Sequence, residues 1–176
     1  MTQTKIPLAI GNLIEILGTS FAFYLIYAAS DIGAVAVRFL FYLLSWMCLV
    51  FFPHCLTHFI VGRLVGIQFT HYSLGKSGVA RLRVPFVSAI ASKAPLLTLR
   101  VDRTSLSSAS RGGRAVMFAS GATASMIMPF YAAVASLQHL PIPLIIFLIV
   151  LSVANLIFDF YYSPRAGDIS RIRSPN

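Results

Sequence analysis

Two histidines four residues apart, His54 and His58, lie near the end of a long apolar run. Residues i and i+4 of a helix lie on one face, one turn apart, so both imidazoles can bind one metal ion. Zinc is the first choice for two imidazoles completed by a carboxylate. The residue after the first histidine is Cys55, where the His-Glu-x-x-His motif of zinc peptidases has its general-base glutamate. The spacing therefore predicts a metal site without the usual base.

The composition places these histidines in a membrane protein. The chain has 176 residues, of which 57% are hydrophobic and only 11% charged, which is more apolar surface than a soluble domain of this size buries. About 20 mostly apolar residues are needed to cross the ~30 Å hydrocarbon layer of a bilayer. Four segments meet this length, at about residues 8–29, 39–61, 114–136 and 142–162. Residues 1–176 are therefore expected to form a single membrane domain with four spans.

The only long polar stretch, at about residues 62–113, is strongly basic. Against a single acid, Asp102, it carries Arg63, Lys76, Arg81, Arg83, Lys93, Arg100, Arg103 and Arg111, with Arg114 at its edge. By the positive-inside rule we expect this stretch to lie in the cytoplasm. Four crossings return the chain to its starting side, so both termini are expected there too. Basic cytoplasmic loops also account for the net charge of +9, so membrane lipids and not nucleic acid are the expected partners.

Two short segments of this insertion, at residues 80–84 and 97–101, alternate apolar with polar residues. This period of two is typical of half-exposed β-strands. We therefore predict an all-α integral membrane protein, with four transmembrane helices and a small β-containing cytoplasmic insertion.

The third metal ligand is expected from an acid near the histidines. Ionisable groups inside a membrane are costly and usually functional. His54 and His58 lie one or two turns short of the predicted cytoplasmic end of the second span, so the third ligand should lie on that side. Two acids meet this condition: Asp159, near the cytoplasmic end of the fourth span, and Asp168, just beyond it. The spacing alone does not choose between them.

The order of these motifs resembles the site-2 protease family of intramembrane zinc metalloproteases over about residues 39–173. Residues 54–58 are similar to the His-Glu-x-x-His motif of that family's core helix. Residues 119–125 resemble the Gly-Pro-x-x-Asn signature of its next span, in which Gly121 is retained while the proline and the asparagine are replaced. The resemblance implies a fold similar to the site-2 protease core.

The last core span of that family carries an asparagine and an Asp-Gly element that supplies the third zinc ligand. Asn155 and the Gly167-Asp168 pair are similar to these, with a longer spacing and with the glycine before the aspartate. The resemblance therefore implies a zinc site whose ligands are His54, His58 and Asp168, with Asp159 as the rival ligand and with Gly121 and Asn155 in support.

The cysteine within the motif decides the expected activity. In the family the motif glutamate acts as general base toward zinc-bound water, and the thiol of Cys55 is a poor substitute. We therefore expect a membrane-embedded metal-binding protein that is non-proteolytic, and that binds transmembrane segments of other proteins without cutting them.

Two alternatives stay open. In the first, the chain is an active zinc-dependent intramembrane endopeptidase, in which Glu15 or a water oriented by Asp159 replaces the missing base. Glu15 lies about two turns into the first span, near the depth inferred for His54 and His58, although it could equally be a hydrogen-bonded packing group. In the second, no metal binds, and the histidines and acids are interhelical partners in a structural subunit of a membrane complex.

Overall fold

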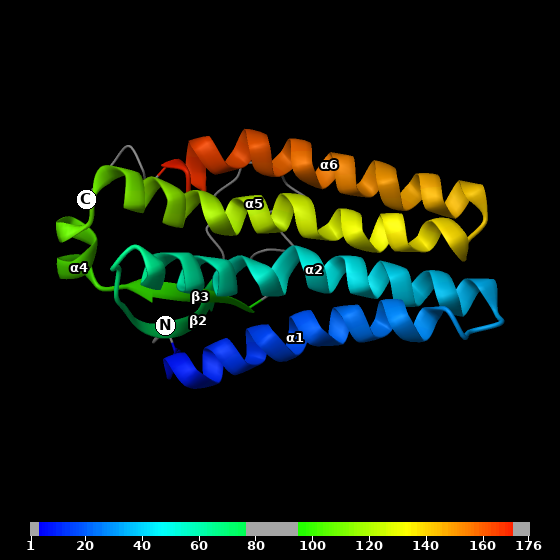
Figure 1. Cartoon of the computed structure of the whole chain (residues 1–176), viewed down its shortest axis with the longest axis horizontal. Helices are drawn as coiled ribbons and strands as arrows, with labels where there is room; N and C mark the ends of the chain where they lie inside the picture. Colours follow the sequence, from blue (N-terminus) through cyan, green and yellow to red (C-terminus); the bar gives the residue numbers. More distant parts are fainter. Residues whose placement is uncertain (1–3, 77–94, 171–176) are drawn as a thin grey trace.

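Four long helices lie side by side in the computed structural model, which describes residues 4–76 and 95–170 (Figure 1). The second helix packs against the first and the third, and the third packs against the fourth. Each helix returns along the bundle beside the one before it (Figure 1). The helices are α1 (Leu8–Ala29), α2 (Val35–Leu64), α5 (Arg111–Ala135) and α6 (Ile142–Ala166).

All four helices are long and apolar enough to cross a membrane, as the four predicted spans require. The first has the predicted bounds, whereas α2 begins four residues before the predicted residue 39, α5 begins three residues before residue 114, and α6 continues beyond residue 162. Hydropathy marks only the apolar part of a helix, while backbone hydrogen bonding continues into polar turns. The Ser110 hydroxyl, for example, accepts the N–H of Gly113 at 3.0 Å and caps α5 before its apolar run starts.

Small residues on the inner faces let the helices approach closely, and large apolar side chains face outward. A Cβ added at Gly11 would meet the ring of Tyr72, and one added at Gly18 would meet the ring of Phe52, each closer than 3.0 Å. The outer faces carry many exposed residues such as Leu17 and Ile157. This arrangement is typical of membrane helices, since lipid gives no reason to bury large side chains.

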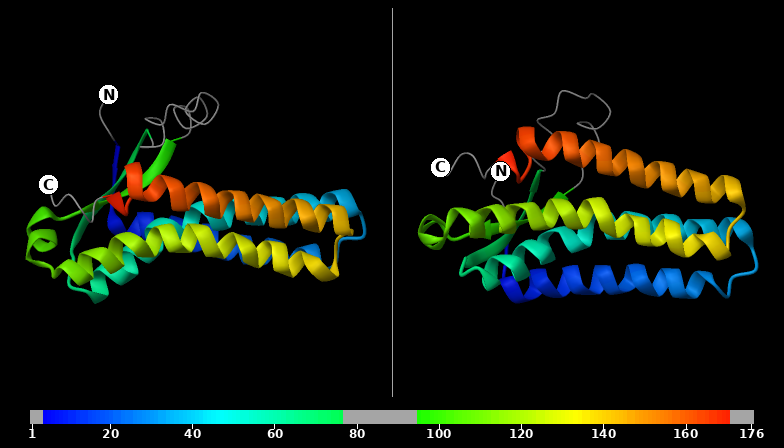
Figure 2. Two further views of the ribbon diagram at one scale, coloured as in Figure 1. Left: turned by 90° about the horizontal axis from the view of Figure 1, so that it is seen from above. Right: turned by 45° about the horizontal axis from the view of Figure 1, so that its top comes forward.

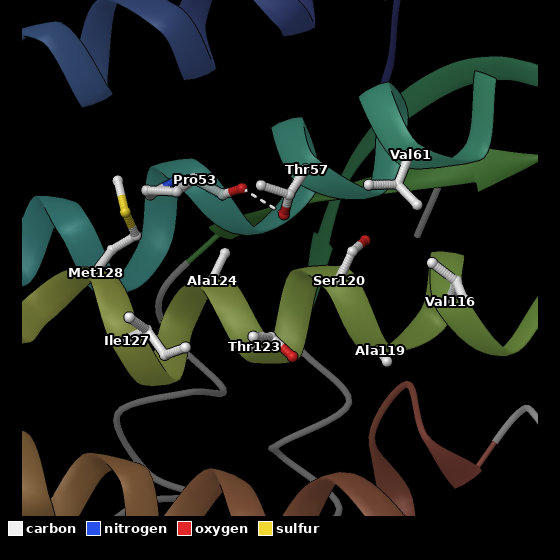
Figure 3. A pocket seen from close by; sticks show the side chains of 10 residues that line it. All are labelled: Pro53, Thr57, Val61, Val116, Ala119, Ser120, Thr123, Ala124, Ile127 and Met128. Carbon is white, nitrogen blue, oxygen red and sulfur yellow. Dashed lines mark hydrogen bonds between the residues drawn. The ribbon is translucent and has the colours of Figure 1, made fainter. Parts of the chain in front are cut away.

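An apolar groove also runs between α2 and α5 (Figure 3).

A three-stranded antiparallel sheet lies at one end of the bundle, which we call the sheet end (Figure 2). Its strand order is β1 (Thr4–Ile6), β2 (Phe69–Lys76) and β3 (Pro95–Val101). The predicted strand at residues 97–101 is confirmed within β3, and the one predicted at residues 80–84 lies outside the described residues. The sequence pattern missed β1, because three residues are too few to show an alternation. It also missed β2, where a register shift between Phe69 and His71 interrupts the alternation.

Apolar contacts join the sheet to the bundle. Tyr72 of β2 and Leu99 of β3, which pair in the sheet, pack with Cys55 of α2 and Met117 of α5 in one buried cluster. After β3 the chain forms the short helix α4 (Arg103–Ser108), capped by the Asp102 carboxylate, which accepts the Ser105 N–H at 2.9 Å. The insertion therefore rests on the helices that carry the two histidines and the Gly121 segment.

The far end of the bundle is held by one arginine. Nε and Nη2 of Arg38 donate to the carbonyl of Ile32 in the α1–α2 connection, and Nη1 donates to the carbonyl of His139 between α5 and α6, at 2.5 Å. The ring of Tyr42 stacks on His139, with centroids 6.4 Å apart. Arg38 thus ties both far-end connections to α2.

Replacing Arg38 by leucine tests whether its hydrogen bonds to Ile32 and His139 stabilise the far end of the bundle. The change keeps an apolar stem and leaves two backbone carbonyls without a charged donor, so we expect a loss of about 2 kcal/mol in unfolding free energy. The melting temperature in detergent, followed by Trp46 fluorescence, should fall by about 4–8 °C. The matched change at the exposed Arg111 of α5 should leave it within about 1 °C. Equal melting temperatures for the two variants would show that the hydrogen bonds of Arg38 do not stabilise the bundle.

Candidate metal centre

His54 and His58 lie on one face of α2, as their spacing predicts. Their rings are 4.8 Å apart and nearly perpendicular, with an interplanar angle of 87°. The helix runs through this region in spite of Pro53, and the Thr57 hydroxyl bonds back to the carbonyls of Pro53 and His54, both at 2.9 Å. Two imidazoles are therefore presented together at the sheet end of α2.

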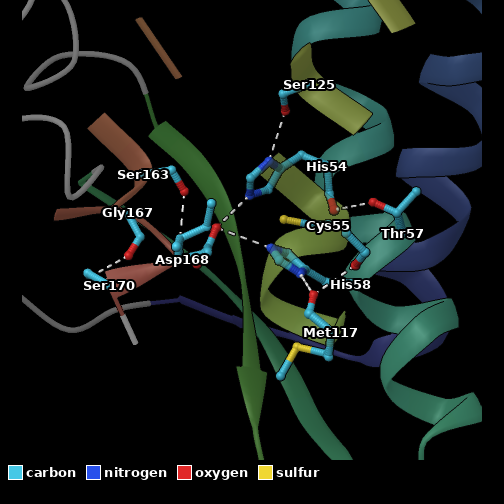
Figure 4. A network of polar contacts seen from close by, with 12 residues as sticks. His54, Cys55, Thr57, His58, Met117, Ser125, Ser163, Gly167, Asp168 and Ser170 are labelled. Carbon is cyan, nitrogen blue, oxygen red and sulfur yellow. Dashed lines mark hydrogen bonds and ion pairs between the residues drawn. The ribbon is translucent and has the colours of Figure 1, made fainter. Parts of the chain in front are cut away.

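Asp168 reaches the two histidines from the turn that follows α6. The helix ends at Ala166, and the turn is closed by the Ile169 N–H, which donates to the Ser163 hydroxyl at 3.3 Å. The Oδ2 atom of Asp168 lies 3.0 Å from Nε2 of His54 and 3.1 Å from Nε2 of His58 (Figure 4). One carboxylate oxygen thus faces both imidazoles.

The other ring nitrogens fix the tautomer of each histidine. Nδ1 of His58 lies 2.7 Å from the carbonyl oxygen of Met117, which can only accept, so this nitrogen carries the hydrogen. Nδ1 of His54 lies 2.9 Å from the Ser125 hydroxyl, which already donates to the carbonyl of Val50 at 3.0 Å, so this nitrogen is a donor too. In the neutral imidazoles, both Nε2 atoms therefore present lone pairs to Asp168.

With both rings neutral, three acceptor atoms then converge. One divalent cation would satisfy all three acceptors. Their ligand atoms lie within 4.8 Å of one another. Ligands about 2.1 Å from a tetrahedral zinc ion are about 3.4 Å apart. The two Nε2–Oδ2 distances of 3.0 and 3.1 Å are within a few tenths of an ångström of this spacing. The donor set fits a metal ion.

The site is largely shielded from solvent. The exposed fraction is 9% for the His58 side chain, 19% for Asp168 and 31% for His54. Burial alone opposes ionisation of the Asp168 carboxyl, and a divalent cation held here would favour the carboxylate form that binds a metal. His54 is the most accessible of the three candidate ligands.

Gly121 of α5 leaves the room that the His58 ring fills. A Cβ at this position would lie closer than 3.0 Å to Nε2, the nitrogen that faces Asp168. Any larger residue would therefore displace the ring from this position. The sequence singled out Gly121 as a supporting residue, and the structure places it directly against His58, a candidate ligand.

Asn155 supports the site through α5. Its Nδ2 donates to the carbonyl of Ser125 at 2.8 Å, and Ser125 in turn holds Nδ1 of His54. A chain of hydrogen bonds thus connects α6, α5 and α2 behind the ligands. The role of Ser125 was missed from sequence, where it stood only as a departure from the resembled signature, and the Met117 carbonyl has no sequence signal at all.

The remaining candidate residues lie near the centre but outside it. Among the described residues, the ligand group contains Asp168 and not Asp159, which lies within range of the charges of His54 and Asp168. Cys55 directs its thiol to the carbonyl of Leu97 in β3, at 3.5 Å, and is not part of the group.

Glu15 is buried on α1, with only 2% of its surface exposed, within electrostatic range of Cys55 and Tyr72. Its Oε2 atom has no hydrogen-bond partner among the described residues. The side-chain oxygen of Asn12, on the same helix, accepts the Tyr72 hydroxyl at 2.8 Å. A role for Glu15 as base stays a prediction. A role for Glu15 as a hydrogen-bonded packing group, through Asn12 or a neighbouring helix, also stays a prediction.

Comparison of the chain with protein-family models, with curated proteins and with solved structures finds no match. The function must therefore be argued from the site itself.

Replacing Gly121 by alanine should displace the His58 ring and lower metal affinity by at least about tenfold, since ligands held 1 Å out of place bind poorly. Gly112 lies on the same helix with nothing within 4 Å of an added Cβ, so Gly112→Ala is the matched control and should bind as the wild type does. Zinc titration of the two metal-stripped variants by calorimetry in detergent measures the difference. Equal affinities would show that the glycine is not needed for ligand placement.

Removing the Ser125 hydroxyl should remove the acceptor that keeps the hydrogen of the His54 ring on Nδ1. Metal binding should then weaken about 10–100-fold, as it commonly does when a hydrogen-bond partner of a metal ligand is lost. Ser125→Ala is compared with Ser136→Ala, which removes a buried hydroxyl that bonds only within its own helix end. Both proteins should fold, as judged by circular dichroism. A Ser136→Ala effect as large as that of Ser125→Ala would mean that the loss is general.

Proposed function

We propose that this chain is a membrane-embedded metal-binding protein, with zinc as the ion and His54, His58 and Asp168 as its ligands. The observation that supports this most strongly is the convergence of two Nε2 lone pairs and a carboxylate oxygen at 3.0 and 3.1 Å, with both Nδ1 atoms held by acceptors. A metal cation would satisfy all three of these lone pairs at once. When bound, zinc would supply a Lewis acid at the sheet end of the bundle.

We further propose that the chain is a divergent relative of the site-2 protease family. The support is the order of the motifs, together with the way they meet: the histidine pair, the glycine of the second motif and the aspartate of the third are neighbours in space. An asparagine from the third motif supports the second through the Ser125 carbonyl. Motifs placed far apart in the sequence meet at one centre.

The position of Cys55 favours a non-proteolytic role within that family. Its thiol bonds to the β3 backbone and lies in the apolar cluster under the sheet, so it is not placed to take a proton from a metal-bound water. We propose that the protein binds transmembrane segments of other proteins, or subunits of a membrane complex, without cutting them. The basic sheet end would face the cytoplasm, with both termini on that side.

The second candidate is an active intramembrane endopeptidase, and Glu15 is the observation that favours it. A buried carboxyl with an unpartnered oxygen is costly inside a membrane, so its retention suggests a use. Glu15 lies on α1 within electrostatic range of Cys55, the neighbour of His54 in the sequence. In this reading it would accept the proton of a water that Asp159 helps to orient.

Metal content tests the first proposal. Elemental mass spectrometry of the detergent-purified wild type should give about one zinc per chain, and the His54→Ala, His58→Ala double variant should give none. The matched control is His139→Ala, at the far end of the bundle, which should retain the metal. Absence of metal in all three, even after incubation with zinc, would leave a structural subunit as the function.

Glu15→Gln separates the two metal-dependent readings. The chain is reconstituted with a fluorescently labelled transmembrane peptide, and both binding and cleavage are followed. We expect the wild type to bind the peptide without cleaving it, and Glu15→Gln to keep its zinc and its binding. Cleavage by the wild type that disappears in Glu15→Gln at full zinc content would replace the non-proteolytic reading with the peptidase.

A further inference from the structure

One face of the three-stranded sheet points away from the bundle and is basic. Ile6, Tyr72 and Leu99 pack in or against the buried cluster between the sheet and the helices, so their neighbours along the strands lie on the opposite face. We call this opposite face the outer face of the sheet (Figure 2). Its polar and basic residues are Lys5 of β1, His71 and Ser73 of β2, and Thr98 and Arg100 of β3.

Two cations of the outer face approach one serine from opposite sides. Lys5 pairs with Ser73 across β1 and β2, which places their Cβ atoms about 5 Å apart. From β3, Nε of Arg100 donates to the Ser73 hydroxyl at 2.9 Å. Ser73 is only 2% exposed, whereas Lys5 and Arg100 are exposed. An ammonium and a guanidinium therefore lie at the surface, on the strands to either side of one hydroxyl.

A third basic side chain lies beside them. His71 is directly opposite Arg100 in the sheet and is half-buried. Its Nδ1 lies 2.9 Å from the Thr70 hydroxyl, which also bonds to the carbonyl of Arg100 at 3.3 Å. Like charges on cross-strand neighbours repel each other, so an anion among these side chains would stabilise the sheet.

The sheet itself carries no acid that could neutralise this face. Asp102, which follows β3 directly, uses its carboxylate to cap α4. Glu15 is buried on α1, and Asp31 lies in the connection at the far end of the bundle. The other two of the five acids in the chain, Asp159 and Asp168, lie in or near the metal centre. Charge complementarity therefore favours an anion from another molecule.

The outer face lies at the depth of lipid headgroups. Lys5 is three residues before Leu8, the first residue of the membrane-spanning helix α1, and three extended residues span at most about 11 Å. β2 begins five residues after α2 ends at Leu64. The headgroup layer on each side of the hydrocarbon core is about 5–8 Å thick. Lipid phosphates are therefore the anions nearest to this face.

We propose that the outer face of the sheet binds the phosphate of an anionic lipid headgroup, with Lys5 and Arg100 as the cations and His71 beside them. Charge-assisted hydrogen bonds from both cations to phosphate oxygens offset the repulsion between them. The lipid belongs to the leaflet at the sheet end of the bundle. None of the three residues belongs to the metal-ligand group, so this site does not depend on the proposed metal centre.

Native mass spectrometry of the whole chain in mild detergent tests the site. The protein is titrated with dioleoyl phosphatidylglycerol or with dioleoyl phosphatidylcholine, which share their acyl chains and differ in net charge. The wild type should retain phosphatidylglycerol with at least about tenfold preference. Replacing Lys5 and Arg100 together by glutamine should remove this preference. The matched control replaces Arg103 of α4 and Arg111 of α5, which are exposed at the sheet end; it loses the same charge and should keep the preference.

A single variant keeps the test valid if the double variant fails to fold, as judged by circular dichroism. Lys5→Gln leaves the bond between Arg100 and Ser73 in place and should lower the preference about fivefold. Equal retention of the two lipids by the wild type, or an equal loss of preference in the matched control, overturns the proposal. Displacement of the lipid by inorganic phosphate would indicate a site for a free anion and also overturns it. So does an acidic protein segment that copurifies in place of a lipid and is lost in Lys5→Gln.

Discussion

A polar group inside a membrane must find its partner within the protein, and this requirement organises the sheet end of the bundle. Each imidazole has two nitrogens to satisfy. One is satisfied by α5, through the Met117 carbonyl and the Ser125 hydroxyl, and the other is left for Asp168. Because α5 accepts the Nδ1–H of each ring, the packing of α5 against α2 leaves each Nε2 with a lone pair.

Close helix packing is the second condition for this arrangement. Gly121 lets α5 approach α2 until the Met117 carbonyl meets His58, and the same approach brings Ser125 within reach of both His54 and Val50. Asn155 then connects α6 to the same turn of α5. Small residues and interhelical hydrogen bonds act together here, which is how membrane helices associate without a hydrophobic force between them.

The spans, the histidine pair and the strand at residues 97–101 were predictable because each has a local pattern: length and apolarity, a spacing of four, and a period of two. The choice between Asp159 and Asp168 was not local. It depends on a turn after α6, closed by Ser163, that returns the chain toward α2. The tautomers of the histidines could not be predicted from the sequence either, because the Met117 carbonyl is a backbone group that any residue could supply.

The contact between His54 and Asp168 joins residues 114 positions apart and so closes nearly the whole bundle into one loop. A metal at this contact would act as a staple, because linking distant positions removes many conformations from the unfolded chain. The order of synthesis determines when such a metal could bind. The two histidines are inserted early, while the aspartate follows only after the last helix, so the centre cannot be complete until all four helices are in the membrane. If the centre binds a metal as proposed, metal loading would show that assembly is finished.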